Sequence, residues 1–470
     1  MGMSSLGAGS GVLTQDLIDK LKNADKAQYV TPIDKKILKE KSQISAFGID
    51  DALMDNLHDS ALSLTQFGTF SSRVATSSVE SVANVTANEG SDLQSFSLDV
   101  SQLATKETDE SDSFGSATDK IATDDGSLTL DIKNAAGDVT SSYDIDYNAD
   151  MTLTDLRDAI NDKAGDELHA SIVQVGDGDF RLFLNANKEG ADQNFSITDN
   201  DGNLSDDNGA SDGGTNLTDN MSTTVDGVNA KFKYNGQDIE RSSNSITDLL
   251  SGVTIDLKST GTTNIDVKQD RQKIEDKINN FIDKYNSAMF QLNQDTKSSQ
   301  KEKERGIFSS SGTMRNMKRE MQNLINSVGG TGGMLQDYGI KYGVDGRLSL
   351  DSEKLNEQLD KNPDNVKAFF QGGTFTNPDG TTTELKGAFN KIEEQVSKYS
   401  KFGGILDNYK NSMSHTLDSL ETQKEKATKR LEAKYATMAK RWSAYDAMIS
   451  KLNAASTTLT TMIDALAPQK

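Results

Sequence analysis

Residues 413–466 read MSHTLDSLETQKEKATKRLEAKYATMAKRWSAYDAMISKLNAASTTLTTMIDAL, and this stretch decides the fold. Its apolar residues recur at alternating steps of three and four, and neither Gly nor Pro occurs between Gly404 and Pro468. The period predicts one long helix with a narrow apolar strip, which is stable only when another helix lies along it. A four-four step at Leu431–Tyr435 resembles a stutter. The strip comprises Met413, Leu417, Leu420, Lys424, Ala427, Leu431, Tyr435, Met438, Trp442, Tyr445, Ile449, Leu452, Ser456, Leu459, Ile463 and Leu466.

The strip predicts an assembly interface. Its two polar members, Lys424 and Ser456, are expected to weaken the helix pairing locally and to bias its register. We expect the terminal helices to be poorly ordered in the isolated subunit and to order only on assembly. The candidate interface residues on the C-terminal side are Leu431, Tyr435, Met438, Trp442, Tyr445, Ile449, Leu452, Leu459, Ile463 and Leu466.

The N-terminal seventy residues repeat this pattern, with narrow apolar faces at helical spacing. Leu17 and Leu21 fall on one face of a first helix, which Thr14 or Ser10 could cap. Ile37 and Ile44 follow after a second helix start at Pro32. The ends of the chain are therefore predicted to pair with each other, and Leu17, Leu21, Ile37 and Ile44 complete the candidate interface.

The middle of the chain changes period from 3.6 to 2 at about Phe70, which indicates β-strands. A single helix interrupts the strands at residues 154–161, and the Asp/Asn/Gly-rich stretch Asp199–Asp219 is predicted to be a loop. Helical periodicity returns at Asp270. The predicted fold class is α+β multidomain, with a helical stem from both termini, a helical second layer and inserted antiparallel β-rich outer domains. The predicted domains are a leg (1–45 and 405–470), a helical bundle (46–70 and 270–404), a first β domain (71–112 and 222–269) and an outer β domain (113–221).

Composition and charge exclude several classes of protein. The chain has 470 residues and no cysteine, which excludes disulfides and thiolate metal sites and fits export in an unfolded state. Its net charge of −22 is concentrated between Glu89 and Asp226, where 31 acidic residues face seven basic ones, so a nucleic-acid partner is excluded. No secretory signal and no membrane span is visible, and we expect no membrane partner and an export route without a cleaved leader.

No residue pattern favours catalysis. His58, His169 and His415 lie far apart in unlike contexts, and each is interpreted as a surface or interface histidine. Asp199–Asn203 resembles a calcium loop, but its glycine is misplaced and no glutamate follows at the required distance. The glycine-rich segment Gly7–Gly11 lacks the spacing of a phosphate loop and is expected to be a flexible tail. We therefore expect no enzyme activity, no cofactor and no metal.

Several segments, in their order along the chain, resemble the flagellar filament cap family, also called hook-associated protein 2. The N-terminal stretch Gly9–Leu13 with Asp16–Ile18 resembles the family's first helix, and residues 153–184 resemble the flagellin IN module. The most specific stretch is Phe232–Thr296, which includes ITDLLSGVTI at 246–255 and FIDKYN at 281–286. Tyr338–Ile340 and Gly346–Asp351 continue the match. Some members have a further outer domain, for which this chain is too short.

The resemblance implies a function at the tip of the bacterial flagellum, outside the cell. Family members form a ring of about four to six subunits, with a pentamer favoured here. The ring promotes folding and polymerisation of exported flagellin and prevents its loss, and it is needed for filament elongation and motility. The implied partners are other copies of the chain, flagellin, the hook–filament junction protein, a cytoplasmic export chaperone and the type III export apparatus.

Two other function classes remain open from the residues alone. An extracellular adhesin could bind host glycans or mucin through the outer β domains, so host glycans are a further candidate partner. A glycan hydrolase would need two carboxylates across a cleft. Abundant Asp leaves such a pair open, although no constellation favours it.

Overall fold

The structure is a computed structural model that describes residue 7 and residues 9–12, 14–205, 217–218 and 221–466. The chain divides into two compact units. Unit 1 combines residues 1–69 with 275–470, and unit 2 is the continuous segment 70–274. Long helices and several antiparallel sheets confirm the predicted α+β multidomain class.

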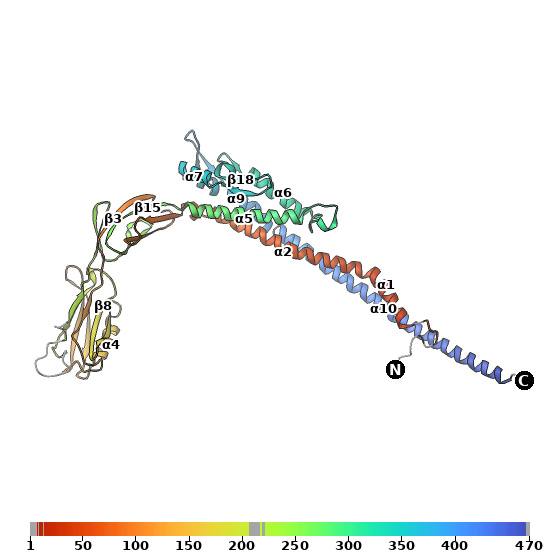
Figure 1. The fold of residues 1–470 in the computed structure, drawn as a ribbon, viewed down its shortest axis with the longest axis horizontal. Helices are drawn as coiled ribbons and strands as arrows, with labels where there is room; N and C mark the ends of the chain where they lie inside the picture. Colours follow the sequence, from red (N-terminus) through yellow and green to blue (C-terminus); the bar gives the residue numbers. More distant parts are fainter. Residues whose placement is uncertain (1–6, 8, 13, 206–216, 219–220, 467–470) are drawn as a thin grey trace. The chain divides into compact units, whose positions relative to one another are not determined.

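The terminal helices of unit 1 lie side by side (Figure 1). They are α1 (Gln15–Tyr29), α2 (Thr31–Thr65) and α10 (Ile405–Leu466), and α10 is the predicted single long helix. Thr14 caps α1 by accepting a hydrogen bond from the backbone N–H of Leu17, and proline stands in the first turn of α2, as predicted.

The apolar spacing of the sequence predicts two helical runs here, one up to Phe47 and a second from Ile49 to Leu64, but helix α2 continues without a break through Gly48. A glycine inside a helix costs about 1 kcal/mol relative to alanine, and the burial of Phe47 and Met54 on either side offsets that cost. The boundary drawn between residues 45 and 46 therefore falls inside one helix.

The rest of unit 1 is a helical bundle with three small hairpins. Phe281 packs edge-on against Phe389 at a centroid distance of 4.8 Å, and Phe370 stacks on Phe389 at 5.3 Å. Helix α9 and the hairpin β20–β21 were not predicted from the sequence. The helices are α5 (Arg271–Asp295), α6 (Gly312–Ser327), α7 (Ser352–Lys361), α8 (Pro363–Gln371) and α9 (Ala388–Ser400). The hairpins are β16–β17 (Gly329–Gly330, Gly333–Met334), β18–β19 (Ile340–Tyr342, Leu348–Leu350) and β20–β21 (Gly373–Thr376, Thr382–Leu385).

Unit 2 contains two β cores. The first is enclosed by a five-stranded sheet in the order β1-β15-β3-β11-β12 and a three-stranded sheet in the order β13-β14-β2. Their strands are β1 (Arg73–Ser77), β2 (Ala83–Ala87), β3 (Gln94–Gln102), β11 (Ala230–Tyr234), β12 (Gln237–Arg241), β13 (Ser245–Leu250), β14 (Val253–Leu257) and β15 (Gly261–Gln269).

The second β core packs helix α4 (Leu153–Ala164) with a four-stranded sheet in the order β10-β4-β8-β7 and a three-stranded sheet in the order β6-β5-β9. Thr152 and Asp155 form a capping box at the start of α4, so the predicted helix is confirmed. The strands are β4 (Thr108–Glu110), β5 (Gly126–Lys133), β6 (Val139–Tyr147), β7 (Leu168–Gly176), β8 (Asp179–Ala186), β9 (Asn194–Asp199) and β10 (Ser222–Val225).

Some strand predictions were wrong in extent. The sequence predicts a strand at Thr224–Tyr234, which is two strands separated by Asp226–Asn229 in the structure. It also shows alternation from Val79 to Ala87, of which only Ala83–Ala87 forms a strand. Residues 206–216 and residue 219 of the predicted acidic loop lie outside the described residues.

Candidate assembly site: the paired terminal helices

A small apolar cluster joins the two ends of the chain. Ile18 of α1 is buried against Leu431 and Tyr435 of α10, and Met438 and Trp442 pack against the same cluster while remaining partly exposed. The buried α10 pair is the four-four step of the strip. The shift in spacing thus coincides with the place where α1 covers α10.

The other predicted interface residues divide into a covered group and an exposed group. Ile37 is buried, and Leu17, Ile44 and Ile449 are partly buried. Leu21 lies at the margin with 39 % of its surface exposed. The exposed group comprises Tyr445, Leu452, Leu459 and Ile463, each with 59–62 % of its surface exposed. The side chain of Leu466 lies outside the described residues.

Ion pairs between the N-terminal helices and α10 follow the antiparallel pairing. Lys41 lies 2.8 Å from Glu421, Asp34 lies 2.7 Å from Lys424, and Asp25 lies 2.6 Å from Lys434. These charges are partly exposed, so each pair contributes little to stability and mainly favours one register. Lys424, which was expected to bias the register of the helix pairing, reaches the carboxylate of Asp34 from within the apolar strip.

Asp25 connects this ladder of ion pairs to the apolar cluster. Besides its contact with Lys434, it accepts a hydrogen bond of 2.9 Å from the hydroxyl of Tyr435. The hydrogen bonds from Lys434 and Tyr435 hold the pKa of Asp25 below its ordinary value. Tyr435 therefore contributes both a buried ring and a polar contact to the pairing of α1 with α10.

The N-terminal glycine-rich segment is bound to α10 through Asp446. The backbone N–H groups of Gly7 and Gly9 donate to Oδ2 of Asp446 at 3.0 Å each. Ser10 donates to Oδ1 through its backbone N–H at 2.8 Å and its hydroxyl at 2.7 Å. The side-chain amide of Asn453 donates to the carbonyl oxygen of Gly9 at 3.0 Å. The expectation of a flexible tail was therefore wrong for these residues.

The Asp446 contact was missed because its residues carry no periodic signal. Asp446 stands beside the strip rather than on it, and its partners are 436 to 439 residues away. The one available hint is the composition of the segment, since Gly and Ser supply unhindered backbone donors.

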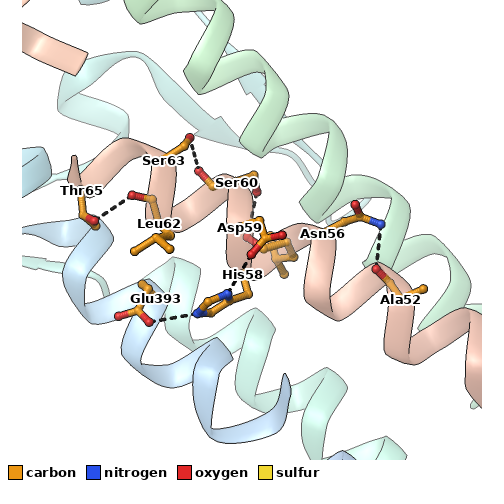
Figure 2. Close-up of polar contacts among 10 residues, drawn as sticks. Ala52, Asn56, His58, Asp59, Ser60, Leu62, Ser63, Thr65 and Glu393 are labelled. Atoms are coloured by element: carbon orange, nitrogen blue, oxygen red, sulfur yellow. Dashed lines mark hydrogen bonds and ion pairs between the residues drawn. The ribbon is translucent and has the colours of Figure 1, made fainter. Parts of the chain in front are cut away.

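The histidines form no catalytic group in the described part of the chain. Figure 2 shows His58 of α2 between two carboxylates, with Nδ1 3.2 Å from Asp59 and Nε2 3.1 Å from Glu393 of α9. His58 therefore bridges two bundle helices, as an interface histidine does. His169 and His415 are exposed, on β7 and α10.

The calcium-like loop is a turn closed by its own side chain. Asp199 accepts hydrogen bonds from the hydroxyl of Tyr147, from the backbone N–H of Asp201 at 3.2 Å and from that of Leu204 at 2.8 Å. These bonds use the oxygens that a cation would need. Within the described ranges, no group of three or more His, Cys, Asp or Glu side chains is placed to hold a metal ion.

Unit 2 has an open cavity of about 520 Å³, lined mostly by polar and charged side chains, with Leu257 as an apolar member. It contains no aromatic platform of the kind that stacks on sugar rings, since the lining residues include Ser242, Ser243, Asn244, Lys188 and Glu189. None of the helices among the described residues is long and apolar enough to cross a membrane.

Helix α2 contains a buried carboxyl group, that of Asp50. Asp50 is only 1 % exposed, and neither of its oxygens has a hydrogen-bond donor among the described groups. Burial and the neighbouring carboxylate of Asp295 raise the pKa of Asp50 to about 8. When Asp50 is protonated, its carboxyl group can donate a hydrogen bond to the carboxylate of Asp295, so the two groups attract rather than repel each other.

Segments that match known protein families make up most of the chain. The flagellar hook-associated protein 2 N-terminus matches residues 10–107, and the flagellar hook-associated protein 2 C-terminus matches residues 227–454. The flagellin hook IN motif matches residues 128–188, where the sequence resembled that module. The C-terminal match includes Asp446, whereas Gly7 and Gly9 precede the N-terminal match.

Curated relatives and solved structures agree with these matches. The chain is 29 % identical over 486 residues to flagellar hook-associated protein 2 of Salmonella typhimurium, with 99 % of both chains covered. It is 28 % identical over 468 residues to the A-type flagellar hook-associated protein 2 of Pseudomonas aeruginosa, covering 95 % of this chain and 94 % of that one.

The crystal structure of the D1–D2–D3 domains of the flagellar cap protein FliD from Escherichia coli superimposes with a TM-score of 0.58 and 26 % identity. The superposition covers 78 % of this chain and 99 % of that one. The adhesin alternative receives no support from the matched families or relatives. The chain belongs to the flagellar hook-associated protein 2 family.

Proposed function

We propose that the protein caps the distal end of the bacterial flagellar filament, promotes the folding and polymerisation of exported flagellin and prevents its loss. Members of its family are flagellar cap proteins, and the protein acts outside the cell at the filament tip. The observation that carries this role is the division of α10. The part of α10 before Lys451 lies against the chain's own N-terminal helices. Every described side chain from Lys451 to Ala465 is exposed.

The exposed end of α10 supports assembly with other molecules. Leu459 and Ile463 continue the apolar strip beyond Asn453, whose side chain donates to the carbonyl oxygen of Gly9. Such a strip is stabilised only by a helical partner. We propose that neighbouring subunits and flagellin supply that partner in a ring of about four to six subunits, with five favoured.

Export accounts for the remaining partners that we propose. The chain has no cysteine, so an exported chain cannot be trapped by disulfides before it folds. The proposed route uses a cytoplasmic export chaperone and the type III apparatus, and the hook–filament junction protein is the proposed neighbour where filament growth begins. We also propose that the protein has no enzymatic activity.

The function can be tested by complementation of a bacterium that lacks its own cap gene. A chain without residues 438–470 is expected to keep both β cores folded and to abolish filament growth, with flagellin lost into the medium. A matched control carries Leu62→Ala, a change of one partly exposed leucine on α2. Normal motility of the truncated chain would refute the capping role of this helix.

A second measurement addresses the order of the leg. Limited proteolysis of the isolated subunit is expected to cleave the exposed end of α10, beyond Asn453, before it cleaves the β cores, with protection regained in the ring. Resistance of this exposed end in the absence of partners would contradict the prediction that it orders only on assembly.

A further inference from the structure

The contact of the N-terminal segment with α10 has the character of a ligand in a site. Asp446 is 3 % exposed, and among the described residues Gly7, Gly9 and Ser10 donate four hydrogen bonds to its carboxylate. A buried carboxylate requires charge-assisted partners, and here backbone N–H groups supply most of them in place of a cation. The successive N–H groups of Gly9 and Ser10 converge on this one anion, as in a nest, a known anion-binding arrangement of the backbone.

The site is selective for glycine at its centre. A Cβ atom on Gly9 would lie 2.3 Å from the carbonyl oxygen of Asp446 and 2.8 Å from the backbone nitrogen of Ser450. These are backbone atoms of α10, so they cannot move aside without disturbing the helix. Gly7 has φ of +99°, which also favours glycine. The close approach to α10 therefore depends on the Gly-x-Gly-Ser pattern of residues 7–10.

The position of this contact divides α10 into two parts. Trp442, which packs against the Ile18 cluster, precedes Asp446 by about one helical turn, and Asn453 follows it by about two. Past Asn453 every described side chain of α10, up to Ala465, is exposed. The bound segment therefore stands at the boundary between the self-paired part of α10 and its exposed end.

We propose that Gly7, Gly9 and Ser10 are an intramolecular ligand of the α10 site formed by Asp446, Ser450 and Asn453. This clasp closes the pair of terminal helices and keeps Met438 and Trp442 from contact with other subunits. The occupant of the site is the chain's own N-terminal segment. The part that concerns other subunits rests on the proposed capping function, whereas the clasp itself can be tested on the isolated chain.

Two substitutions open the clasp by different means. Asp446→Asn keeps the shape of the side chain, but its amide nitrogen would face the N–H groups of Gly7 and Gly9, so donor meets donor. Gly9→Ala introduces the methyl group that the backbone of α10 excludes. Gly48→Ala is the matched glycine control, since a methyl group there meets nothing within 4 Å, and Asp464→Asn is the matched control on exposed α10.

Hydrogen exchange of the full chain tests the contact directly. The peptide that contains residues 7–12 is expected to exchange about tenfold faster in Asp446→Asn and Gly9→Ala than in the wild type and both controls. Equal exchange in the wild type and Asp446→Asn would overturn the proposal. Unchanged helix content by circular dichroism shows that the variants are folded, and Ser10→Ala, which removes only the hydroxyl donor, provides a milder third variant.

Trp442 provides a second readout because it is the only tryptophan in the chain. Acrylamide quenching of its fluorescence is expected to rise by about twofold when the clasp opens and to stay unchanged in the controls. Quenching that is the same in the wild type, Asp446→Asn, Gly9→Ala and both controls would contradict the shielding of Trp442. Both measurements use the isolated subunit, so a negative result for the clasp leaves the capping role intact. If the full-length chain has a closed clasp but fails to restore filament growth, that result counts against the capping role alone.

Discussion

Lys424 of α10 and Asp34 of α2 form an ion pair with 2.7 Å between Nζ and Oδ1. The lysine interrupts the apolar strip of α10, and its long side chain reaches the carboxylate of Asp34 on the neighbouring helix. Together with Lys41–Glu421 and Asp25–Lys434, the pair fixes how α10 aligns with the N-terminal helices. Each ion pair is weak, but any other register of the helices would separate all three pairs at once.

The Lys424–Asp34 pair predicts a small, salt-dependent coupling. A double-mutant cycle with Lys424→Ala and Asp34→Ala is expected to give a coupling free energy of about 0.2–1 kcal/mol, because both side chains are partly exposed. The coupling should decrease when the salt concentration is raised. It can be measured by chemical unfolding at low and high salt, and a salt-independent coupling would contradict the ion-pair interpretation.

Two leucines on α10 separate folding from assembly. Leu431→Ala removes a side chain that is buried against Ile18, and we expect a loss of about 2 kcal/mol in the free energy of unfolding of the stem. Leu459→Ala changes an exposed leucine of the same helix and should alter subunit stability by less than about 0.5 kcal/mol while it weakens ring formation. Thermal unfolding and sedimentation of the two variants test this contrast. Equal effects of both substitutions on stability would refute it.

The clasp at Asp446 predicts opening only in strong acid. The hydroxyl of Ser10 and the backbone N–H groups of Gly9, Ser10 and Gly7 hold the pKa of Asp446 at about 2, compared with about 3.9 for a free aspartate. Because the pKa is lowered in the closed state, the clasp has its full stability above pH of about 4 and loses it as the pH falls towards 2. Quenching of Trp442 should rise over this range in the wild type. In Asp446→Asn it should already be high at neutral pH, with little change attributable to this site.

The buried carboxyl of Asp50 predicts the opposite dependence. Its pKa is raised to about 8 by burial and by Asp295, so the folded protein binds a proton that the unfolded chain releases above about pH 4. The stability of unit 1 should therefore fall as the pH rises from about 4 to about 8 and then level off. Asp50→Asn should remove this fall and raise the melting temperature at pH 8 by about 2–4 °C per kcal/mol recovered.

Thermal melting of the wild type and Asp50→Asn at pH 5 and pH 8.5 measures the effect of Asp50. Asp51→Asn on the same helix serves as the control, because that carboxylate is not buried. A wild type whose melting temperature shows the same pH dependence as Asp50→Asn would contradict the role assigned to the Asp50–Asp295 pair.

Periodicity in the sequence predicted the long helix, its strip and most strands, because each is a local pattern of apolar residues. Strand β12 was missed because its residues Gln237–Arg241 contain one apolar side chain and show no alternation of buried positions. Helix α9 does have helical spacing in Phe389, Ile392 and Val396, so its signal was present in the sequence. The two predicted helical runs of α2 merged because packing on both sides of Gly48 overrides its low propensity.

The polar contacts of the stem could not be predicted in the same way. The ion pair of Lys424 with Asp34 and the bonds of Asp446 with residues 7–10 join segments hundreds of residues apart, and hydrogen bonding imposes no period on either segment. A charged residue beside an apolar strip has many candidate partners, and only the three-dimensional register of the helices selects one. Burial is likewise decided in space, so Asp446 and Asp50 resembled solvated carboxylates in the sequence.

The division into a continuous unit 2 and a split unit 1 has a consequence for the timing of folding. If the chain emerges from a narrow channel by either end, residues 70–274 are all available before the second half of unit 1 has appeared. Contacts that close a loop of more than 400 residues also carry the largest entropic cost of closure. The β cores can thus be complete while the stem is still open, so closure of the stem comes last and coincides with release of the chain.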